Sequence, residues 1–245
     1  MQTGERVAIV TGSARGIGAA VAERLSKDGF AVTINYAGSQ APAEEMVNKI
    51  KEAGGTAIAV KADVSDSSAV KALFDATEDA FGGVDVLVNN AGIMKLAPIA
   101  EADDALFDQH LAVNLKGVFN CMREGARRIR EGGRIVSFSS SVVGLYQPTY
   151  GPYAATKAGV EAMTHILAKE LGSKKITVNA IAPGPVATPL FLDDKSDEQV
   201  AQISKLIPLG RLAEPEDIAA AVSFLSGVDS HWVSGQVLRA NGGMV

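Results

Sequence analysis

Short apolar runs rich in valine and isoleucine alternate with longer amphipathic stretches along almost the whole chain. The apolar runs lie at residues 6–10, 31–36, 56–60, 84–88, 134–138, 176–181 and 236–240. Strands that are apolar along their length are typical of a parallel sheet buried between helices. Helical periodicity marks residues 16–28, 41–53, 67–80, 103–130, 151–172 and 215–226. The pattern therefore predicts an α/β fold with a doubly wound sheet.

The composition is that of a single globular domain. No linker rich in Ser, Gly or Pro and no repeat of fixed period divides the 245 residues, so we expect one domain over residues 1–245. Hydrophobic residues make up 47% and charged residues 21%, which is enough apolar surface for a substantial core. The net charge of −5 disfavours nucleic acid and anionic membranes as partners.

Membrane and metal chemistry are both disfavoured by the sequence. No apolar run approaches the roughly 18 residues of a membrane span, and the first ten residues lack the apolar core of a signal peptide. We therefore expect a cytoplasmic protein. The single cysteine, Cys121, lies in an apolar helical pattern that favours packing. His110, His165 and His231 stand apart from any metal-binding spacing, so we expect no metal ion.

A glycine-rich turn follows the first predicted strand. In TGSARGIG, residues 11–18, Gly12 can reverse the chain, Gly16 can let the backbone approach a phosphate, and Gly18 can let helix and strand pack closely. The N-terminus of the helix that begins there offers free N–H groups and a positive dipole end. A turn between a buried strand and a helix at the start of an alternating chain predicts a dinucleotide-binding site.

Four motifs occur in a fixed order along the chain. They are the Gly-x-x-x-Gly-x-Gly turn, NNAG at residues 89–92, YAATK at 153–157 and PGPVAT at 183–188. With them the chain resembles the short-chain dehydrogenase/reductase family from Arg6 to Gly243, and among its subfamilies the 3-oxoacyl-[acyl-carrier-protein] reductase type. The resemblance implies a Rossmann-like domain with a seven-stranded parallel sheet. It also implies an oxidoreductase that transfers hydride between a nicotinamide cofactor and a carbonyl.

The end of the second strand bears on which nicotinamide cofactor is used. A carboxylate there would bind the ribose 2′-hydroxyl of NAD and repel the 2′-phosphate of NADP. The position that carries aspartate in NAD-using relatives falls on Tyr36, between Asn35 and Ser39, and Arg15 stands where NADP-preferring relatives place a basic residue. We therefore expect NADP(H).

The resemblance extends to further residues of the cofactor site. Asp63 and Val64 are similar to an adenine-contacting pair, and Val186 and Thr188 to residues that meet the carboxamide after the turn at Pro183 and Gly184. The complete cofactor set that it implies is Gly12, Ser13, Arg15, Gly16, Ile17, Gly18, Asn35, Tyr36, Ser39, Asp63, Val64, Asn90, Ala91, Gly92, Tyr153, Lys157, Pro183, Gly184, Val186 and Thr188.

Tyr153 and Lys157 lie four residues apart and so share one face of a helix. A phenol titrates near 10, and a neighbouring ammonium group lowers that pKa, so we expect Lys157 to favour the phenolate and Tyr153 to exchange a proton with the substrate oxygen. A second donor to this oxygen comes from SFSSSVVG, residues 137–144. The family spacing to the tyrosine indicates Ser140, whereas counting back from Gly144 indicates Ser141, and we expect Ser140. Asn114 matches the family asparagine that kinks its helix and holds a water near Lys157.

Substrate and partners are less well specified. Residues 189–212 match the family's variable substrate lid, and with Met94, Val142, Leu145, Tyr146 and Tyr150 they predict a mainly apolar pocket for a ketone or aldehyde. A basic cluster, Arg127, Arg128 and Arg130, leaves open the docking of an acyl carrier protein, although a solvated basic helix end is the simpler interpretation.

The helices at 103–130 and 151–172 and the C-terminal stretch from Trp232 resemble family subunit contacts, which implies a homotetramer. Oxidation of an alcohol or sugar, and a catalytically silent NADP-binding regulator, remain as alternatives.

Overall fold

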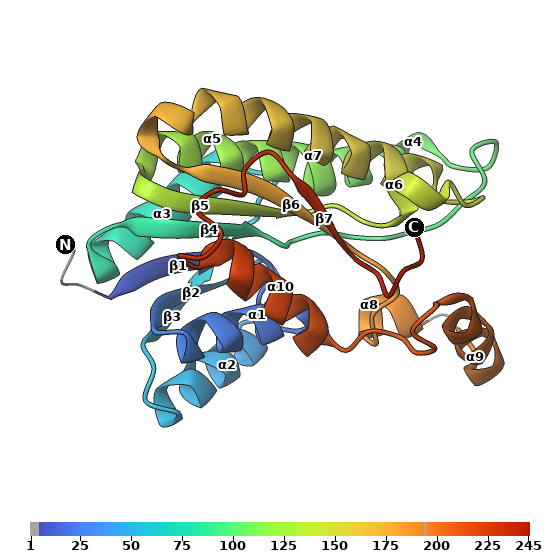
Figure 1. Ribbon diagram of the computed structural model, residues 1–245, viewed down its shortest axis with the longest axis horizontal. Coiled ribbons are helices and arrows are strands. Elements are labelled where there is room, and N and C mark those ends of the chain that lie inside the picture. The colour runs from blue at the N-terminus through green and yellow to red at the C-terminus, as the bar shows by residue number, and fades with distance from the viewer. Residues whose placement is uncertain (1–4, 194) are drawn as a thin grey trace.

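Seven parallel strands form one sheet in the order β3-β2-β1-β4-β5-β6-β7 (Figure 1). The computed structural model describes residues 5–193 and 195–245. The strands are β1 (Arg6–Val10), β2 (Phe30–Tyr36), β3 (Ala57–Lys61), β4 (Val84–Asn89), β5 (Ile129–Phe138), β6 (Thr177–Pro183) and β7 (Val237–Ala240). The seven-stranded parallel sheet predicted from the apolar runs is confirmed, with half of the strand ends moved by one or two residues and the start of β5 moved from residue 134 to 129.

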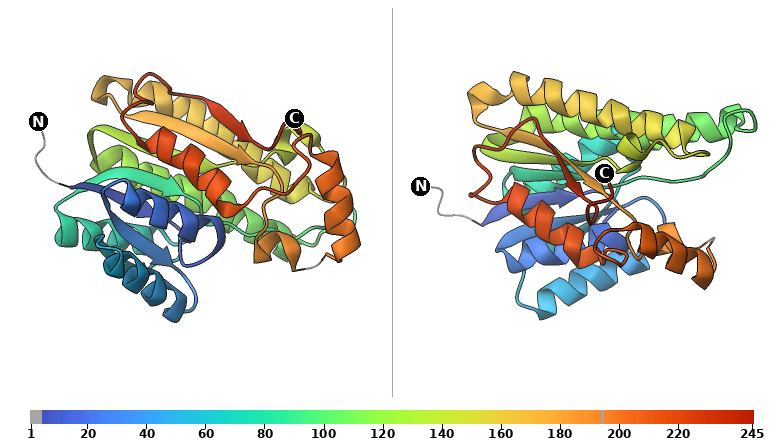
Figure 2. Two further views of the ribbon diagram at one scale, coloured as in Figure 1. Left: turned by 60° about the horizontal axis from the view of Figure 1, so that its bottom comes forward. Right: turned by 45° about the vertical axis from the view of Figure 1, so that its right-hand side comes forward.

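Helices cover both faces of the sheet (Figures 1 and 2). One layer holds α1 (Gly16–Lys27), α2 (Ala41–Glu52) and α10 (Pro215–Ser226), and the other holds α3 (Ser67–Phe81), α5 (Val118–Arg128) and α7 (Gly151–Glu170). Successive strand residues point to opposite faces, so Val88 packs in the core under the first layer and Leu87 in the core under the second. The strands read as continuously apolar because both faces are buried.

The long helix predicted for residues 103–130 is divided in three. It consists of α4 (Asp104–His110), the π-helical segment η1 (Leu111–Gly117) and α5, which ends at Arg128. The prediction is wrong for residues 129 and 130, because β5 already begins at Ile129, which pairs with Val84 before the register shifts. Gly132, with a φ of 80°, and Gly133, where a Cβ would lie 2.5 Å from the Asp85 carbonyl oxygen, allow this irregular strand entry.

The direction of winding reverses between β1 and β4. The chain runs from β1 outward to β2 and β3 and then returns to β4 on the other side of β1, so the loops after β1 and β4 diverge at one edge of the sheet. Open α/β sheets bind ligands in the crevice at such a point, beyond the carboxyl ends of the strands. The short helices α6 (Val142–Leu145), α8 (Pro189–Leu192) and α9 (Asp197–Leu206) lie at this edge, whereas the 3₁₀ turn η2 (Gly172–Lys174) follows α7 at the opposite edge (Figure 1).

The structure adds two facts that bear on membranes and metals. Within residues 5–193 and 195–245, no helix combines the length and the apolar character needed to cross a membrane. Over the same residues, no three side chains of His, Cys, Asp or Glu come together as metal ligands.

Candidate active site

Two adjoining cavities occupy the carboxyl edge of the sheet. We call the first the glycine cleft; it has a volume of ≈ 530 Å³ and extends from the turn after β1 to the ends of β2 and β3. We call the second the tyrosine pocket; it has a volume of ≈ 210 Å³ and lies between β5, α7 and the segment after β6. The two cavities share part of their lining: Ile17, Asn90, Gly92, Ile93, Thr188 and Leu190. A ligand in the glycine cleft can therefore reach into the tyrosine pocket.

The glycines of the first turn are required by local geometry. Gly12 and Gly16 have φ angles of 62° and 57°, in the left-handed region that side chains disfavour. A Cβ on Gly18 would lie 2.5 Å from the Asn90 side-chain nitrogen and 2.6 Å from the Gly12 carbonyl oxygen. Gly18 thus lets the start of α1 pack against the two loops at the reversal point, rather than against a strand as the sequence suggested.

Asn90 and Thr11 join the loops after β1 and β4. The Asn90 Nδ2 donates to the carbonyl oxygens of Thr11, at 2.9 Å, and Gly12, at 3.0 Å. In return, the Thr11 hydroxyl oxygen accepts the backbone N–H groups of Asn90 and Ala91, both at 3.0 Å. These bonds fix the floor shared by the two cavities.

The polar residues at the end of β2 have mostly structural partners. Asn35 is 1% exposed; its Oδ1 accepts the Gly12 N–H at 3.1 Å and its Nδ2 donates to the Ala62 carbonyl oxygen at 3.0 Å. The Ser13 hydroxyl donates to the Val10 carbonyl oxygen at 2.7 Å and does not line either cavity. Arg15 and Ser39, by contrast, are exposed at the cleft. The side chains free to meet a ligand here are those of Arg15 and Ser39.

Most of the predicted site residues come together around the two cavities. Those at the glycine cleft are Gly12, Arg15, Gly16, Ile17, Gly18, Asn35, Tyr36, Ser39, Asp63, Val64, Asn90, Ala91, Gly92 and Thr188. Those at the tyrosine pocket are Ile17, Asn90, Gly92, Ser140, Tyr153, Lys157, Pro183, Gly184, Val186 and Thr188. Ser13 and Asn114 line neither cavity, and both are buried behind the wall.

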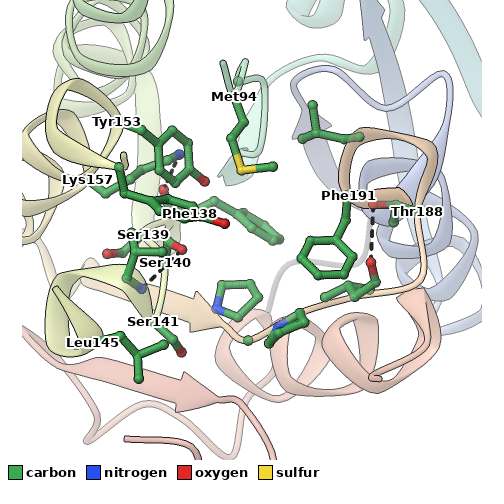
Figure 3. Close-up of a pocket in the computed structure, with 18 of the residues that line it drawn as sticks. Met94, Phe138, Ser139, Ser140, Ser141, Leu145, Tyr153, Lys157, Thr188 and Phe191 are labelled. Atoms are coloured by element: carbon green, nitrogen blue, oxygen red, sulfur yellow. Dashed lines mark hydrogen bonds between the residues drawn. The ribbon is translucent and has the colours of Figure 1, made fainter. Parts of the chain in front are cut away.

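Tyr153 and Lys157 project from α7 into the tyrosine pocket, as Figure 3 shows. The Lys157 Nζ lies 5.6 Å from the centre of the Tyr153 ring and donates to the Phe138 carbonyl oxygen at 2.9 Å. The Ser140 side chain lines the same pocket and acts on the Tyr153 phenol, lowering its pKa. Strand β5 and helix α7 therefore meet through backbone and side chain, and they present a hydroxyl, a phenol and an ammonium group to one space.

Burial governs the protonation of these groups. It raises the pKa of Tyr153 to about 12, whereas the Ser140 side chain acts to lower this pKa. Burial lowers the pKa of Lys157 to about 8. The expectation that Lys157 depresses the tyrosine pKa is wrong for the protein alone, because the ammonium group is turned to the Phe138 carbonyl and loss of hydration dominates. At neutral pH the phenol is protonated.

The three consecutive serines after Phe138 point in different directions (Figure 3). The Ser139 hydroxyl donates to the Glu161 carboxylate at 2.6 Å. The Ser141 hydroxyl donates to the Ala182 carbonyl oxygen at 3.2 Å and accepts from Asn241 Nδ2 at 3.1 Å. The Ser140 hydroxyl oxygen accepts the Val142 N–H at 3.4 Å, and Ser140 is the serine that lowers the pKa of Tyr153. With the hydroxyls of Ser139 and Ser141 donated to other groups, Ser140 remains the candidate donor to a substrate oxygen.

Asn114 sits in the π-helical segment η1 and is fully buried. Its Oδ1 accepts the Ile93 N–H and its Nδ2 donates to the Ile93 carbonyl oxygen, both at 2.8 Å. A π-turn widens the helix by one residue and often occurs at functional sites. The helix distortion expected at Asn114 is present, and the side chain holds the loop after β4 in place.

The segment after β6 forms the far wall of the tyrosine pocket. Gly184 packs against the C-terminal stretch, since a Cβ there would lie 2.9 Å from the Asn241 Cα. The predicted lid contributes Leu190, Phe191, Ile203 and Leu206 from α8, α9 and their surroundings. Its residue 194 lies outside the described residues.

The prediction of the apolar wall is partly wrong. Met94, Val142, Leu145 and Tyr150 line the tyrosine pocket as expected. Tyr146 does not, because a left-handed turn at this residue, with a φ of 51°, leaves its side chain 80% exposed. Met244 was missed; it lines the pocket from the chain end, and no local sequence pattern indicates that position.

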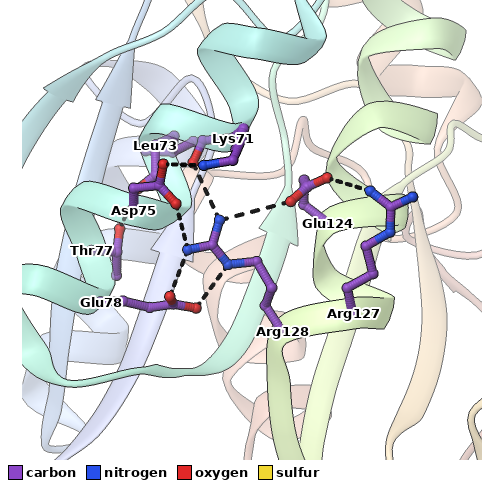
Figure 4. Close-up of polar contacts among 8 residues, drawn as sticks. All are labelled: Lys71, Leu73, Asp75, Thr77, Glu78, Glu124, Arg127 and Arg128. Atoms are coloured by element: carbon purple, nitrogen blue, oxygen red, sulfur yellow. Dashed lines mark hydrogen bonds and ion pairs between the residues drawn. The ribbon is translucent and has the colours of Figure 1, made fainter.

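The three arginines of the basic cluster, at the junction of α5 and β5, pair with carboxylates within the protein; Figure 4 shows the contacts of Arg127 and Arg128. Arg128, whose side chain is 17% exposed, pairs with Asp75 and Glu78 of α3, which hold its pKa above the ordinary range for arginine. Arg127 pairs with Glu124 at 2.9 Å. Arg130 pairs with Asp85 at 3.2 Å.

Comparisons with known proteins agree on the family. A family model described as enoyl-(acyl carrier protein) reductase matches residues 12–245. An NADPH-dependent aldehyde reductase-like protein, chloroplastic, of Arabidopsis thaliana is 45% identical over 98% of this chain and 94% of its own length. A 3-oxoacyl-[acyl-carrier-protein] reductase of Staphylococcus aureus is 41% identical over 97% of each chain.

A solved structure gives the same result. A short chain dehydrogenase from Burkholderia cenocepacia in complex with NADP superposes with a TM-score of 0.92, at 37% identity, over 98% of this chain and 97% of its own. Identities of 37–45% extend over nearly the whole of both chains in each of these comparisons. The chain belongs to the short-chain dehydrogenase/reductase family.

Proposed function

We propose that the protein is an NADPH-dependent reductase that converts an apolar aldehyde or ketone into an alcohol. The observation that carries this proposal is the placement of Tyr153, Ser140 and Lys157 around one space that opens into the glycine cleft. A single NADP(H)-binding domain over residues 1–245 is part of the proposal.

The glycine cleft fits a dinucleotide with a 2′-phosphate. The left-handed glycines bring the backbone and the N-terminus of α1 to the cleft wall, where N–H groups bind phosphate oxygens. Arg15 and Ser39 are exposed beside Tyr36, at the place where a carboxylate would select NAD. NADPH, when bound, supplies a hydride to the carbonyl carbon. The relatives whose names include NADPH or NADP support this choice.

Tyr153 is proposed as the proton donor to the carbonyl oxygen. Burial raises the pKa of the phenol to about 12, so Tyr153 holds its proton at neutral pH and has it to donate to a carbonyl oxygen. Ser140 is proposed to donate a second hydrogen bond to the same oxygen as charge develops on it. Lys157, buried beside the tyrosine, is proposed to stabilise the phenolate left after proton transfer.

The lining of the tyrosine pocket supports an uncharged apolar substrate. Among the described residues that line it, Lys157 carries the only charged side chain. Apolar side chains supply much of the remaining lining, including Phe138, Leu145, Phe191 and Leu206. A sugar phosphate would lose its hydration in this pocket without gaining a partner for its phosphate.

The pairing of the basic cluster argues against carrier docking at Arg127, Arg128 and Arg130. Their guanidinium groups already have carboxylate partners. An acidic protein would have to compete with these partners. The cluster also lies near the start of β5, at the edge of the sheet opposite the tyrosine pocket. We therefore propose a free carbonyl compound as the substrate.

The test is a screen of aliphatic and aromatic aldehydes, ketones, and a 3-oxoacyl thioester on acyl carrier protein, read by loss of NADPH absorbance. Turnover of free apolar carbonyls, with a higher kcat/KM for NADPH than for NADH, is the expected result. Turnover of the carrier-bound thioester alone would contradict the substrate proposal, and no turnover of any carbonyl would contradict the function.

We also propose a homotetramer. Exposed apolar side chains support it: Phe119 and Ile166 lie on α5 and α7, and Trp232, which is 91% exposed, precedes the edge strand β7. Light scattering coupled to size-exclusion chromatography measures the mass; a monomer would contradict the proposal.

A further inference from the structure

The loop after β4 forms part of the wall of both cavities without belonging to a helix or strand. Gly92 and Ile93 line both cavities, and Met94 lines the tyrosine pocket. Residues 90–98 have no regular secondary structure. Backbone N–H groups in such a segment need partners outside a ladder, so the conformation of this wall depends on the side chains that accept from it.

Three side chains supply these acceptors. Thr11 accepts from Asn90 and Ala91, and Asn114 accepts from Ile93. The third is His110, whose Nε2 accepts the Lys95 N–H at 3.1 Å. His110 and Asn114 are four residues apart, one at the end of α4 and the other in η1, and together they hold the loop at two alternate residues.

The environment of His110 fixes its chemical form. The ring is 0% exposed, and its Nδ1 lies 2.8 Å from the Leu106 carbonyl oxygen. Because a carbonyl only accepts, Nδ1 carries the proton and Nε2 is the bare acceptor for Lys95. Both ring nitrogens are therefore used, and neither faces the tyrosine pocket.

The same ring also touches Tyr153. The two ring centres are 6.3 Å apart and the planes meet at 79°, an edge-to-face arrangement. His110 thus contacts two parts of the site at once: the loop that carries Met94, and the phenol ring proposed as the proton donor.

We propose that His110 is a positioning residue for carbonyl reduction. Its Nε2 holds the loop at Lys95, next to the pocket-lining Met94, and through its ring it supports Tyr153. This inference rests on the proposed function, because the reaction that is positioned is the reduction of a carbonyl. His110 itself transfers no proton to the substrate.

Two variants separate the acceptor from the ring. His110→Phe keeps an aromatic ring against Tyr153 and leaves the Lys95 N–H without a partner, whereas His110→Gln places an amide oxygen near the position of Nε2. The bond from Lys95 to His110 is part-buried, so in His110→Phe the Lys95 N–H either loses its partner or moves toward water, and the loop shifts with it. We therefore expect His110→Phe to lower kcat/KM for the carbonyl by about tenfold or more. His110→Gln is expected to restore kcat/KM to within about threefold of the wild type.

The dissociation constant for NADPH, measured by fluorescence, is expected to change less than about threefold in either variant. Lys95, the residue that His110 holds, does not line the glycine cleft, and the loop residues that do line it are held by Thr11 and Asn114. Thr77→Val is the matched control. Thr77 is a buried threonine on α3 whose hydroxyl bonds to Leu73 and Thr33, remote from both cavities. This variant is expected to lower the midpoint of thermal unfolding and to leave kcat/KM unchanged.

Hydrogen exchange at the Lys95 amide gives a readout that needs no turnover. We expect slow exchange in the wild type and in His110→Gln, and fast exchange in His110→Phe. Open-chain exchange at Lys95 in the wild type, wild-type kcat/KM in His110→Phe, or equal losses in the Phe and Gln variants would each overturn the inference. If the wild type reduces no carbonyl, the proposed function fails, while the exchange data still decide whether His110 holds the loop. If His110→Phe does not fold, exchange at the Lys95 amide in the wild type and in His110→Gln still decides whether His110 holds the loop.

Discussion

Replacing Ser140 and Ser141 one at a time by alanine separates two roles that neighbouring serines have in this structure. Ser140 contacts the Tyr153 phenol at the tyrosine pocket. Ser141 is 3% exposed and bonds to Ala182 and Asn241. The first substitution is expected to affect the reaction, and the second the stability of the fold.

The two magnitudes follow from these contacts. Loss of one preorganised donor to a developing oxyanion lowers kcat by about 10²- to 10³-fold, which is the effect expected for Ser140→Ala. Ser141→Ala removes two hydrogen bonds, each contributing about 1 kcal/mol. For a chain of this size, the loss is expected to lower the midpoint of thermal unfolding by roughly 4–8 °C. We expect kcat to stay within about threefold of the wild type.

The assay pairs steady-state reduction of a carbonyl that the wild type turns over with thermal unfolding followed by circular dichroism. Binding of NADPH by each variant serves as the control for an intact glycine cleft. A large loss of kcat in Ser141→Ala with near-normal turnover in Ser140→Ala would refute the assignment. Equal effects of the two substitutions would also contradict it.

Three further predictions concern the glycine turn, the cofactor and the buried lysine. Gly18→Ala places a Cβ 2.5 Å from the Asn90 side chain and is expected to lower the free energy of unfolding by about 1–3 kcal/mol, measured by urea titration; unchanged stability would contradict the packing role. Arg15→Ala is expected to raise the KM for NADPH about tenfold, through loss of a charge-assisted bond to the 2′-phosphate, and to leave the KM for NADH unchanged; equal changes would show that Arg15 does not contact this phosphate. Because burial lowers the pKa of Lys157 from 10.5 to about 8, the folded protein binds fewer protons than the unfolded chain between these values. The lysine therefore adds stability as pH rises from 8 to 10, by up to about 1.4 kcal/mol per pH unit. Urea titrations without cofactor are expected to show that Lys157→Met removes this rise. An unchanged dependence of the free energy of unfolding on pH in this variant would contradict the lowered pKa of Lys157.

The alternation of apolar runs and amphipathic stretches was sufficient to predict the sheet. Ile9 and Val10 lie in a run that is apolar on both faces because both faces are covered by helices, and this is visible in the sequence. The irregular entry of β5 was not predicted, because it depends on the pairing of Ile129 with Val84 across the sheet. Local periodicity contains no information about such a partner.

The candidate site was predictable as a set of positions, and less so as a set of contacts. The ordered motifs were sufficient to predict that Tyr153 and Lys157 lie together at one site. They did not show that the side-chain amide of Asn35 is hydrogen-bonded to the backbone of Gly12 and Ala62. They also did not show that burial, more than Lys157, determines the pKa of Tyr153. Both results depend on solvent exclusion and on partners brought together only by the folded chain.

The central claim is that Tyr153 gives its proton to the carbonyl oxygen. The most direct test measures kcat for Tyr153→Phe, which keeps the aromatic ring and removes the hydroxyl, alongside the dissociation constant for NADPH. We predict a fall in kcat of about 10²- to 10⁴-fold with NADPH binding close to that of the wild type. A variant that binds NADPH and retains kcat within about tenfold of the wild type would contradict the claim.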